Sequence, residues 1–165
     1  MATKTQFYGV GAEIKRLLKE VKDLEQEGVR QLKLAAITVI EALQSKTPVW
    51  SGETVRNYAV GVGQKPSGGE KAPIGTSPPG DTNSMSLGEE PRRPANEAAA
   101  IADAHASLSR LRRLQSLVIT NLVSDEKWDL VDSGSAPTPE RARYPGGVAI
   151  AGLQKAKQML GENWR

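Results

Sequence analysis

A long helical pattern that stops at a proline–glycine corner is the feature that most constrains how this chain folds. Apolar residues recur every three or four positions from Val10 to Leu24, and the pattern resumes from Leu32 to Leu43. This spacing predicts one amphipathic helix of roughly 35 residues. It would be about 50 Å long, since each residue adds about 1.5 Å. Gly28 interrupts the pattern, and a bend, if the helix has one, is expected there because glycine costs about 1 kcal/mol relative to alanine.

The length of this helix leaves two interpretations open. In the first, it is an ordinary amphipathic helix that lies on a sheet of its own chain. In the second, it also packs on neighbouring subunits. The second is favoured to some extent, because such a helix is longer than one small sheet can cover.

The corner that follows spans residues 47–58. Pro48 ends the helix, because a residue before proline is pushed out of the helical region and proline has no N–H to donate. Gly52 permits the turn, and Arg56 to Val62 alternates enough to predict a strand. A long helix that turns sharply into a strand, with no catalytic group in a recognisable arrangement, indicates a scaffold that works by shape and assembly.

The character of the sequence changes between Gly61 and Asn96. This stretch contains seven glycines, six prolines and no aromatic residue. A connection this long without regular structure is uncommon in a compact domain. Either it is a surface loop, or it is an arm that becomes ordered against a neighbouring chain, with Ile74, Met85 and Leu87 as its few anchors.

A second helix is predicted from Pro94 to Arg113, since proline suits a first helical turn. Its expected apolar face includes His105, the one histidine of the chain, which we interpret as a packed structural residue. The full expected face is Ala98, Ile101, Ala102, His105 and Leu108. Arg110, Arg112 and Arg113 close the helix, where cations complement the helix dipole; contact with DNA or an acidic partner is the alternative.

The last third of the chain predicts a strand, a loop and a final helix. Leu117 to Val123 is the segment richest in β-branched residues. Trp128 to Val131 predicts a short strand or turn, and a proline- and glycine-rich loop follows from Ser133 to Gly147. The closing helix is expected to carry Ala149, Leu153, Ala156 and Leu160 on one face.

Composition excludes several classes of protein. The chain has 165 residues, of which 38% are hydrophobic and 4% aromatic, and it has no cysteine. Disulfides and thiolate metal sites are therefore excluded. The first residues lack the apolar run of a signal peptide, and no window approaches a membrane span. The net charge of +3 is low for a dedicated nucleic-acid binder.

One motif suggests catalysis. Leu130 to Ala136 contains Asp132-Ser133-Gly134 after two apolar residues and resembles the active-site loop of aspartic proteases, which retroviral enzymes complete by dimerising. Ile150-Ala151-Gly152 resembles a second element of those enzymes, but only about 15 residues separate the two, too few for the strands and flap between them. An aspartic-protease-like dimer that uses Asp132 is kept as a remote alternative.

Other chemistries find less support. One histidine and no cysteine leave no nucleophile–base constellation, and the glycine-rich pieces lack the lysine and spacing of a phosphate-binding loop. No acidic or histidine cluster has metal-ligand spacing. We therefore expect no enzyme, no metal and no cofactor.

Three segments in order resemble one known family. Residues 48–57, Pro-Val-Trp-Ser-Gly-Glu-Thr-Val-Arg-Asn, resemble the corner of neck and tail-completion proteins of tailed bacteriophages. Residues 128–137 resemble their second signature, and Val148 to Leu160 resembles their closing helix. Trp50-Ser51 replaces the commoner Asp-Thr, Asp132 stands where Glu is frequent, and the usual Pro-Phe near the end of the second signature is absent.

This resemblance implies a single α+β domain over residues 1–165, with a long loop or arm at about 63–93. The long N-terminal helix would pack on a small antiparallel sheet, together with a second and a C-terminal helix. The protein would form a homo-oligomeric ring, six- or twelve-fold, at the head–tail junction of the virion after synthesis in the bacterial cytoplasm. Connector or adaptor proteins would flank it on the head side, and tail terminator or tail tube proteins on the tail side.

In such a ring, DNA would pass through the lumen without being read in sequence, and no membrane would be contacted. The residues expected at corners or interfaces are Pro48, Trp50, Gly52, Arg56, Asp132, Gly134, Arg143 and Pro145. The alternative from another class is a basic accessory protein that binds double-stranded DNA.

Overall fold

A long helix and a two-stranded sheet organise the structure. The computed structural model describes residues 10–47, 53–75, 93–125, 128 and 147–161. The elements are α1 (Val10–Lys46), α2 (Glu53–Arg56), β1 (Tyr58–Val62), α3 (Arg93–Leu108), β2 (Leu117–Asn121) and α5 (Val148–Leu160). The α+β class, with a long N-terminal helix, a small antiparallel sheet and a C-terminal helix, is confirmed.

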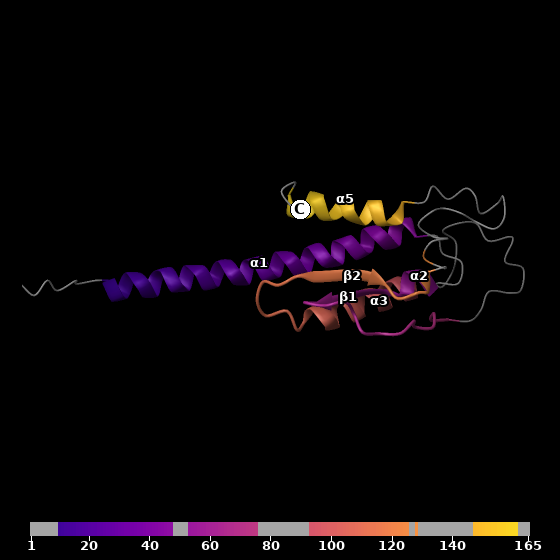
Figure 1. Cartoon of the computed structure of the whole chain (residues 1–165), viewed down its shortest axis with the longest axis horizontal. Coiled ribbons are helices and arrows are strands. Elements are labelled where there is room, and N and C mark those ends of the chain that lie inside the picture. Colours follow the sequence, from indigo (N-terminus) through magenta and orange to yellow (C-terminus); the bar gives the residue numbers. More distant parts are fainter. Residues whose placement is uncertain (1–9, 48–52, 76–92, 126–127, 129–146, 162–165) are drawn as a thin grey trace, which may run out of the picture.

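α1 is a single helix of 37 residues that continues through Gly28. An added Cβ at Gly28 would lie 3.1 Å from a methyl group of Leu114, so the glycine lets the loop before β2 approach the helix. The second half of α1 packs into the body, whereas the first half extends away from it (Figure 1). The two halves of one amphipathic pattern therefore meet different surroundings.

The C-terminal end of α1 is held by polar contacts from distant residues. Arg93 donates to the carbonyl oxygens of Gln44, at 2.5 Å, and Thr47, at 3.2 Å. The Thr47 hydroxyl lies 2.6 Å from the hydroxyl of Tyr58. Gln44 lies in the last turn of α1 and Thr47 directly follows the helix, so Arg93 adds hydrogen bonds at the position where the helix stops.

The strand after the corner begins later than the sequence predicts. Glu53–Arg56 forms the short helix α2, and Asn57 closes a turn back to the carbonyl of Thr54, at 3.3 Å. β1 therefore starts at Tyr58, and the expectation that Arg56 lies in the strand is wrong. The turn places Arg56 toward α3 instead of in the sheet.

The sheet is an antiparallel pair in which Tyr58 lies opposite Asn121 and Val62 lies opposite Leu117. Gly61 in β1 is required by close packing, because a Cβ there would lie 1.9 Å from the carbonyl oxygen of Gln64. The chain after β1 thus folds tightly over the strand.

The buried face of α3 agrees only in part with the expected one: Leu108 is buried and Ile101 packs against the core, whereas Ala98 and Ala102 are exposed. Its buried residues are Asn96, Ala100, Ala104 and Leu108, which recur every four positions. His105 is exposed, so its interpretation as a packed residue is wrong. The helix ends at Leu108, before the three arginines, which lie on the loop that leads to β2.

α5 runs antiparallel alongside the second half of α1 (Figure 1). Gly152 is buried at the contact, and a Cβ there would lie 2.5 Å from Cδ2 of Leu43. The absence of a side chain at this position sets how closely the two helices approach.

The core lies between α1, α3, α5 and the sheet. Its centre is formed by aliphatic side chains with one aromatic ring, Tyr58, as the scarcity of aromatic residues leads one to expect. The buried residues of this cluster are Ala36, Ile37, Val39, Ile40, Leu43, Tyr58, Val60, Ala104, Leu108 and Val148.

Candidate interaction surfaces

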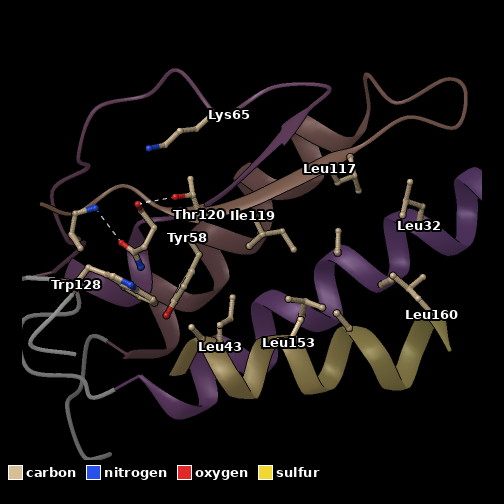
Figure 2. A pocket seen from close by; sticks show the side chains of 18 of the residues that line it. Leu32, Leu43, Tyr58, Lys65, Leu117, Ile119, Thr120, Trp128, Leu153 and Leu160 are labelled. Atoms are coloured by element: carbon tan, nitrogen blue, oxygen red, sulfur yellow. Dashed lines mark hydrogen bonds between the residues drawn. The ribbon is translucent and has the colours of Figure 1, made fainter. Parts of the chain in front are cut away.

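An apolar pocket of about 490 Å³ opens between α1, β2 and α5. Figure 2 shows Trp128 and Tyr58 at one end and Leu32 and Leu160 at the other. Its walls are mostly aliphatic, and its lining includes Leu43, Leu117, Ile119, Val123, Leu153 and Ala156.

Parts of two of the three segments that carry the family resemblance line this pocket, together with the residue that follows the first segment. Tyr58 directly follows the corner segment, and its ring packs edge-on against Trp128, which opens the second segment, with ring centroids 6.2 Å apart. α5, the third segment, forms the opposite wall. Residues far apart in sequence therefore build one continuous structural unit.

The lining of the pocket suits apolar contacts better than a chemical reaction. Its charged lining residues are Lys65 and Asp125. Among the described residues, no group of acidic or histidine side chains could hold a metal ion. An arrangement of this kind suits the binding of an apolar side chain, whereas acid–base chemistry requires titratable groups aimed at one point.

A cluster of ionic contacts joins α2, α3 and the chain after β1. Arg56 and Lys71 both donate to the same carboxylate oxygen of Asp103, at 2.6 and 2.7 Å. The hydrogen bond from Lys71 and that from Arg56 lower the pKa of Asp103 below its ordinary value of 3.8. Arg56, expected at a corner or interface, is mostly buried within its own chain, and its Nε has no partner among the described residues.

Two asparagine side chains hold the start of the glycine- and proline-rich stretch against the body. Asn57 accepts from the amide of Lys71 and donates to its carbonyl, at 2.7 and 2.9 Å. Asn96 does the same for Ile74, at 2.8 and 3.1 Å. Ile74 is thus anchored through its backbone, while its side chain stays exposed. Residues 76–92, with Met85 and Leu87, lie outside the described part, and an arm that reaches a neighbour stays a prediction.

The first half of α1 presents apolar residues to solvent. Residues 11–27 are all exposed. Five large aliphatic residues on this half define what we call the α1 stripe: Ile14 (51% exposed), Leu17 (47%), Leu18 (64%), Val21 (62%) and Leu24 (72%). Their spacing of three, one, three and three places them on one side of the helix. A contiguous apolar stripe of this kind is typical of an interaction surface.

Charged residues on this half pair with one another along the helix. Arg16 contacts Glu13 at 2.5 Å and Glu20 at 2.8 Å. Hydrogen bonds from Arg30 and then Gln31 lower the pKa of Glu27 to about 2. Such exposed pairs at three- or four-residue spacing stabilise the helix only slightly. They do not explain why the apolar residues between them are uncovered.

The three arginines proposed for DNA or acidic partners are exposed. Arg110, Arg112 and Arg113 lie on the loop between α3 and β2. Leu114, the next residue, lies beside Gly28 of α1, where the run of exposed residues 11–27 ends. Arg113, the neighbour of Leu114 in sequence, is therefore close to this end of the exposed half.

The remaining residues expected at corners or interfaces lie outside the described part of the chain: Pro48, Trp50, Gly52, Asp132, Gly134, Arg143 and Pro145. Sequence reasoning missed Asp103, Lys71, Asn57 and Asn96. Their contacts join residues 14 to 47 positions apart, so no local pattern indicates them. In the described part of the chain, no helix combines the length and the apolar character needed to cross a membrane.

Comparison with known proteins gives no family assignment. No protein-family model matches this sequence, and no curated protein or solved structure matches it.

Proposed function

We propose that this protein is a structural subunit of a ring at the head–tail junction of a tailed bacteriophage, as a neck or tail-completion protein. The observation that carries this proposal is the α1 stripe. Five aliphatic side chains on the first half of a 37-residue helix are 47–72% exposed. A subunit whose helix is covered by its neighbours accounts for this exposure.

The three family-like segments add support. They come in the expected order, and the described parts of the second and third segments line one pocket on an α+β scaffold. In the proposed assembly, heterologous contacts close a ring of six or twelve copies. Connector or adaptor proteins bind one side, tail terminator or tail tube proteins bind the other, and DNA passes through the lumen without sequence recognition. This role requires neither catalysis nor a cofactor.

Electron microscopy of the purified full-length chain tests this proposal. Particles should be rings with a central opening, alone or after addition of the connector protein. Labelled protein should also be found at the head–tail junction of virions. Single small particles under all these conditions, and no label on virions, would count against it.

A double-stranded DNA-binding accessory protein is the second candidate, because Arg110, Arg112 and Arg113 are exposed on one loop. Affinity that depends on phosphate contacts falls steeply as salt rises. A titration of DNA binding at 50 and 200 mM salt, with the triple alanine variant as control, separates the two. A ring component should bind free DNA weakly at both salt concentrations. The triple alanine variant should bind DNA with nearly the same affinity as the wild type.

The protease alternative has its own test. Because the proposed function includes no catalysis, neither the wild-type chain nor Asp132→Asn should cleave peptides. Proteolysis by the wild-type chain that the variant loses would favour the protease.

A further inference from the structure

The α1 stripe continues the face of α1 that is covered inside the body. About eighteen residues make five full turns of a helix, so side chains that far apart point in the same direction. Leu18 thus points the same way as Ala36, and Val21 the same way as Val39. Ala36 and Val39 belong to the core, whereas the stripe extends past the end of α5 (Figure 1). An apolar partner like the one inside the body therefore suits the stripe.

Glu25 brings a charge into this apolar face. It comes seven positions after Leu18 and four after Val21, and side chains at these spacings point to the same side of a helix. About five turns further on, the equivalent residue is Leu43, which packs against Gly152 of α5. A carboxylate is costly at an apolar interface unless an opposite charge meets it. The partner of the stripe should therefore combine aliphatic side chains with a cation.

The outer side of α5 offers this combination. Ile150 and Leu153 are 60% and 56% exposed. Lys157 follows Leu153 by four positions and is also exposed, so the three side chains form one surface, which we call the α5 outer face. Gly152, two positions after Ile150, points to the opposite side, where it contacts Leu43. The packing of α5 on its own α1 therefore leaves the α5 outer face uncovered.

We propose that the α1 stripe of one copy packs on the α5 outer face of the next copy, with Glu25 paired to Lys157. The charges are complementary, because Glu25 lies among the aliphatic residues of the stripe and α5 has lysines but no acidic residue. The contact joins two different surfaces, and every copy has both. Such a heterologous contact generates a ring when the rotation between copies closes. Each α5 would then lie between its own α1 and that of its neighbour.

Other surfaces fit the stripe less well. In the described part of the chain, the remaining exposed large apolar residues have no exposed large apolar neighbour within four positions: Leu34, Ile74, Leu114 and Met159. The stripe of another copy would give a contact about a two-fold axis, which ends at a pair and does not build a ring. Outside α1, the α5 outer face is the described surface that places a cation beside two exposed aliphatic side chains.

Cross-linking between two single-cysteine variants tests this contact, and the chain has no cysteine of its own. Glu25→Cys and Lys157→Cys chains, mixed and treated with a short bismaleimide, should give a covalent dimer that contains one chain of each kind. Asp23→Cys is the matched control, because Asp23 is exposed two positions before Glu25 but points to the opposite side of α1. Asp23→Cys mixed with Lys157→Cys should give far less of the covalent dimer.

Two results of this experiment would overturn the inference. One is a mixture of Glu25→Cys and Lys157→Cys that cross-links no better than the Asp23→Cys control. The other is efficient cross-linking of Glu25→Cys with itself, which indicates that the stripe packs on the stripe of another copy.

Exchange of the two charges tests the pairing without a cross-linker. Glu25→Lys alone and Lys157→Glu alone should each need at least about tenfold more protein to assemble, as measured by light scattering. A chain with both substitutions should assemble like the wild type. Glu25→Lys with Lys155→Glu has the same net charge, but Lys155 points to nearly the opposite side of α5 from Lys157, so this variant should stay impaired. Equal assembly of the two double variants would contradict the pairing.

The inference rests on the proposed ring in taking the neighbour to be a second copy, and the outcomes separate the two. Rings that form without the cross-link between positions 25 and 157 leave the proposed function standing and overturn this contact. The same cross-link in open chains of subunits that never close supports the contact and contradicts the proposed function. A chain that stays monomeric, alone and with its connector protein, contradicts both.

Discussion

Asp103 is the residue at which three separate parts of the chain meet. Arg56 from α2 and Lys71 from the stretch after β1 share one of its carboxylate oxygens. Both partners favour the charged form, which is why the pKa of Asp103 lies below its ordinary value of 3.8. The side chain is 41% exposed, so solvent screens much of this interaction.

Asp103→Asn should therefore reduce the free energy of unfolding at pH 7 by no more than about 1 kcal/mol. A carboxylate whose pKa is lowered by folding stabilises the folded state above the unfolded pKa, and this contribution disappears as pH falls through the lower folded value. Urea unfolding at pH 7 and at pH 3 should show the difference between variant and wild type shrinking at the lower pH. Asp23→Asn, on the exposed half of α1, is the control and should change nothing at either pH.

Gly152 sets the distance between α1 and α5, and this role was not predicted. In the sequence it is one more small residue on a helix. The structure shows that a Cβ would meet Cδ2 and Cγ of Leu43 at 2.5 and 2.8 Å. Because Leu43 is itself buried, it has little room to move.

Gly152→Ala should lower the melting temperature, because overpacking costs about 1–3 kcal/mol and exceeds the gain in helix propensity of about 1 kcal/mol. Gly11→Ala is the matched control, since Gly11 also lies in a helix but has open space around its Cα. Thermal unfolding of Gly11→Ala should show an unchanged or slightly higher melting temperature. A stabilised Gly152→Ala would show that the two helices are less tightly packed than we describe.

At the scale of elements, α1 shows what periodicity predicts and what it does not. The three-to-four residue spacing predicts the helix and nearly its full length. Periodicity cannot distinguish the half that is covered by its own chain from the half that is exposed, because both need an apolar face. That distinction depends on where α3, α5 and the sheet end along the helix.

The exposed half of α1 should behave as a marginal helix in the isolated subunit. Helices of this length without tertiary packing are only partly formed in water. In dilute protein, the amides of residues 14–24 should exchange with solvent far faster than those of residues 35–43. Protection of the first segment should rise as the protein assembles. Equal protection of both segments in a verified monomer would contradict this account.

α3 shows a different limit of sequence reasoning. Its alanines are spread around the helix, so the apolar pattern fits more than one face. The face through Ala100 and Ala104 is buried because small residues there let the helix approach β1 and α1. The choice of face, and hence the exposure of His105, depends on that long-range contact. α2 was missed for a related reason, since one turn of helix is too short to show a period.

At the scale of the whole molecule, the sequence predicted the α+β class but not the polar contacts that hold its parts together. The helix, both strand regions and the closing helix could be located from periodicity and residue type. Arg93 at the end of α1 and the two asparagines that bind the chain after β1 could not, because their partners are distant in sequence. The pocket was likewise unpredicted, although Tyr58 and Trp128 were already part of the segments singled out.

At this scale we predict that polar substitutions in the α1 stripe prevent assembly of the subunits. Leu17→Gln with Val21→Gln should prevent assembly while leaving the subunit folded, because neither side chain packs into the core. Circular dichroism and thermal unfolding of the body should match the wild type. Leu43→Gln, at a buried position on the same helix, should instead unfold the subunit. If the double variant assembles normally, the stripe is not the interface.

The mass of the assembled protein tests the central claim most directly. Native mass spectrometry of the full-length chain, alone and with its connector and tail-side partners, should show one dominant closed species of six or twelve copies of the 17.7 kDa subunit. The Leu17→Gln, Val21→Gln variant should stay monomeric under the same conditions. A wild-type chain that is monomeric in every mixture would contradict the proposal that this fold is a ring subunit.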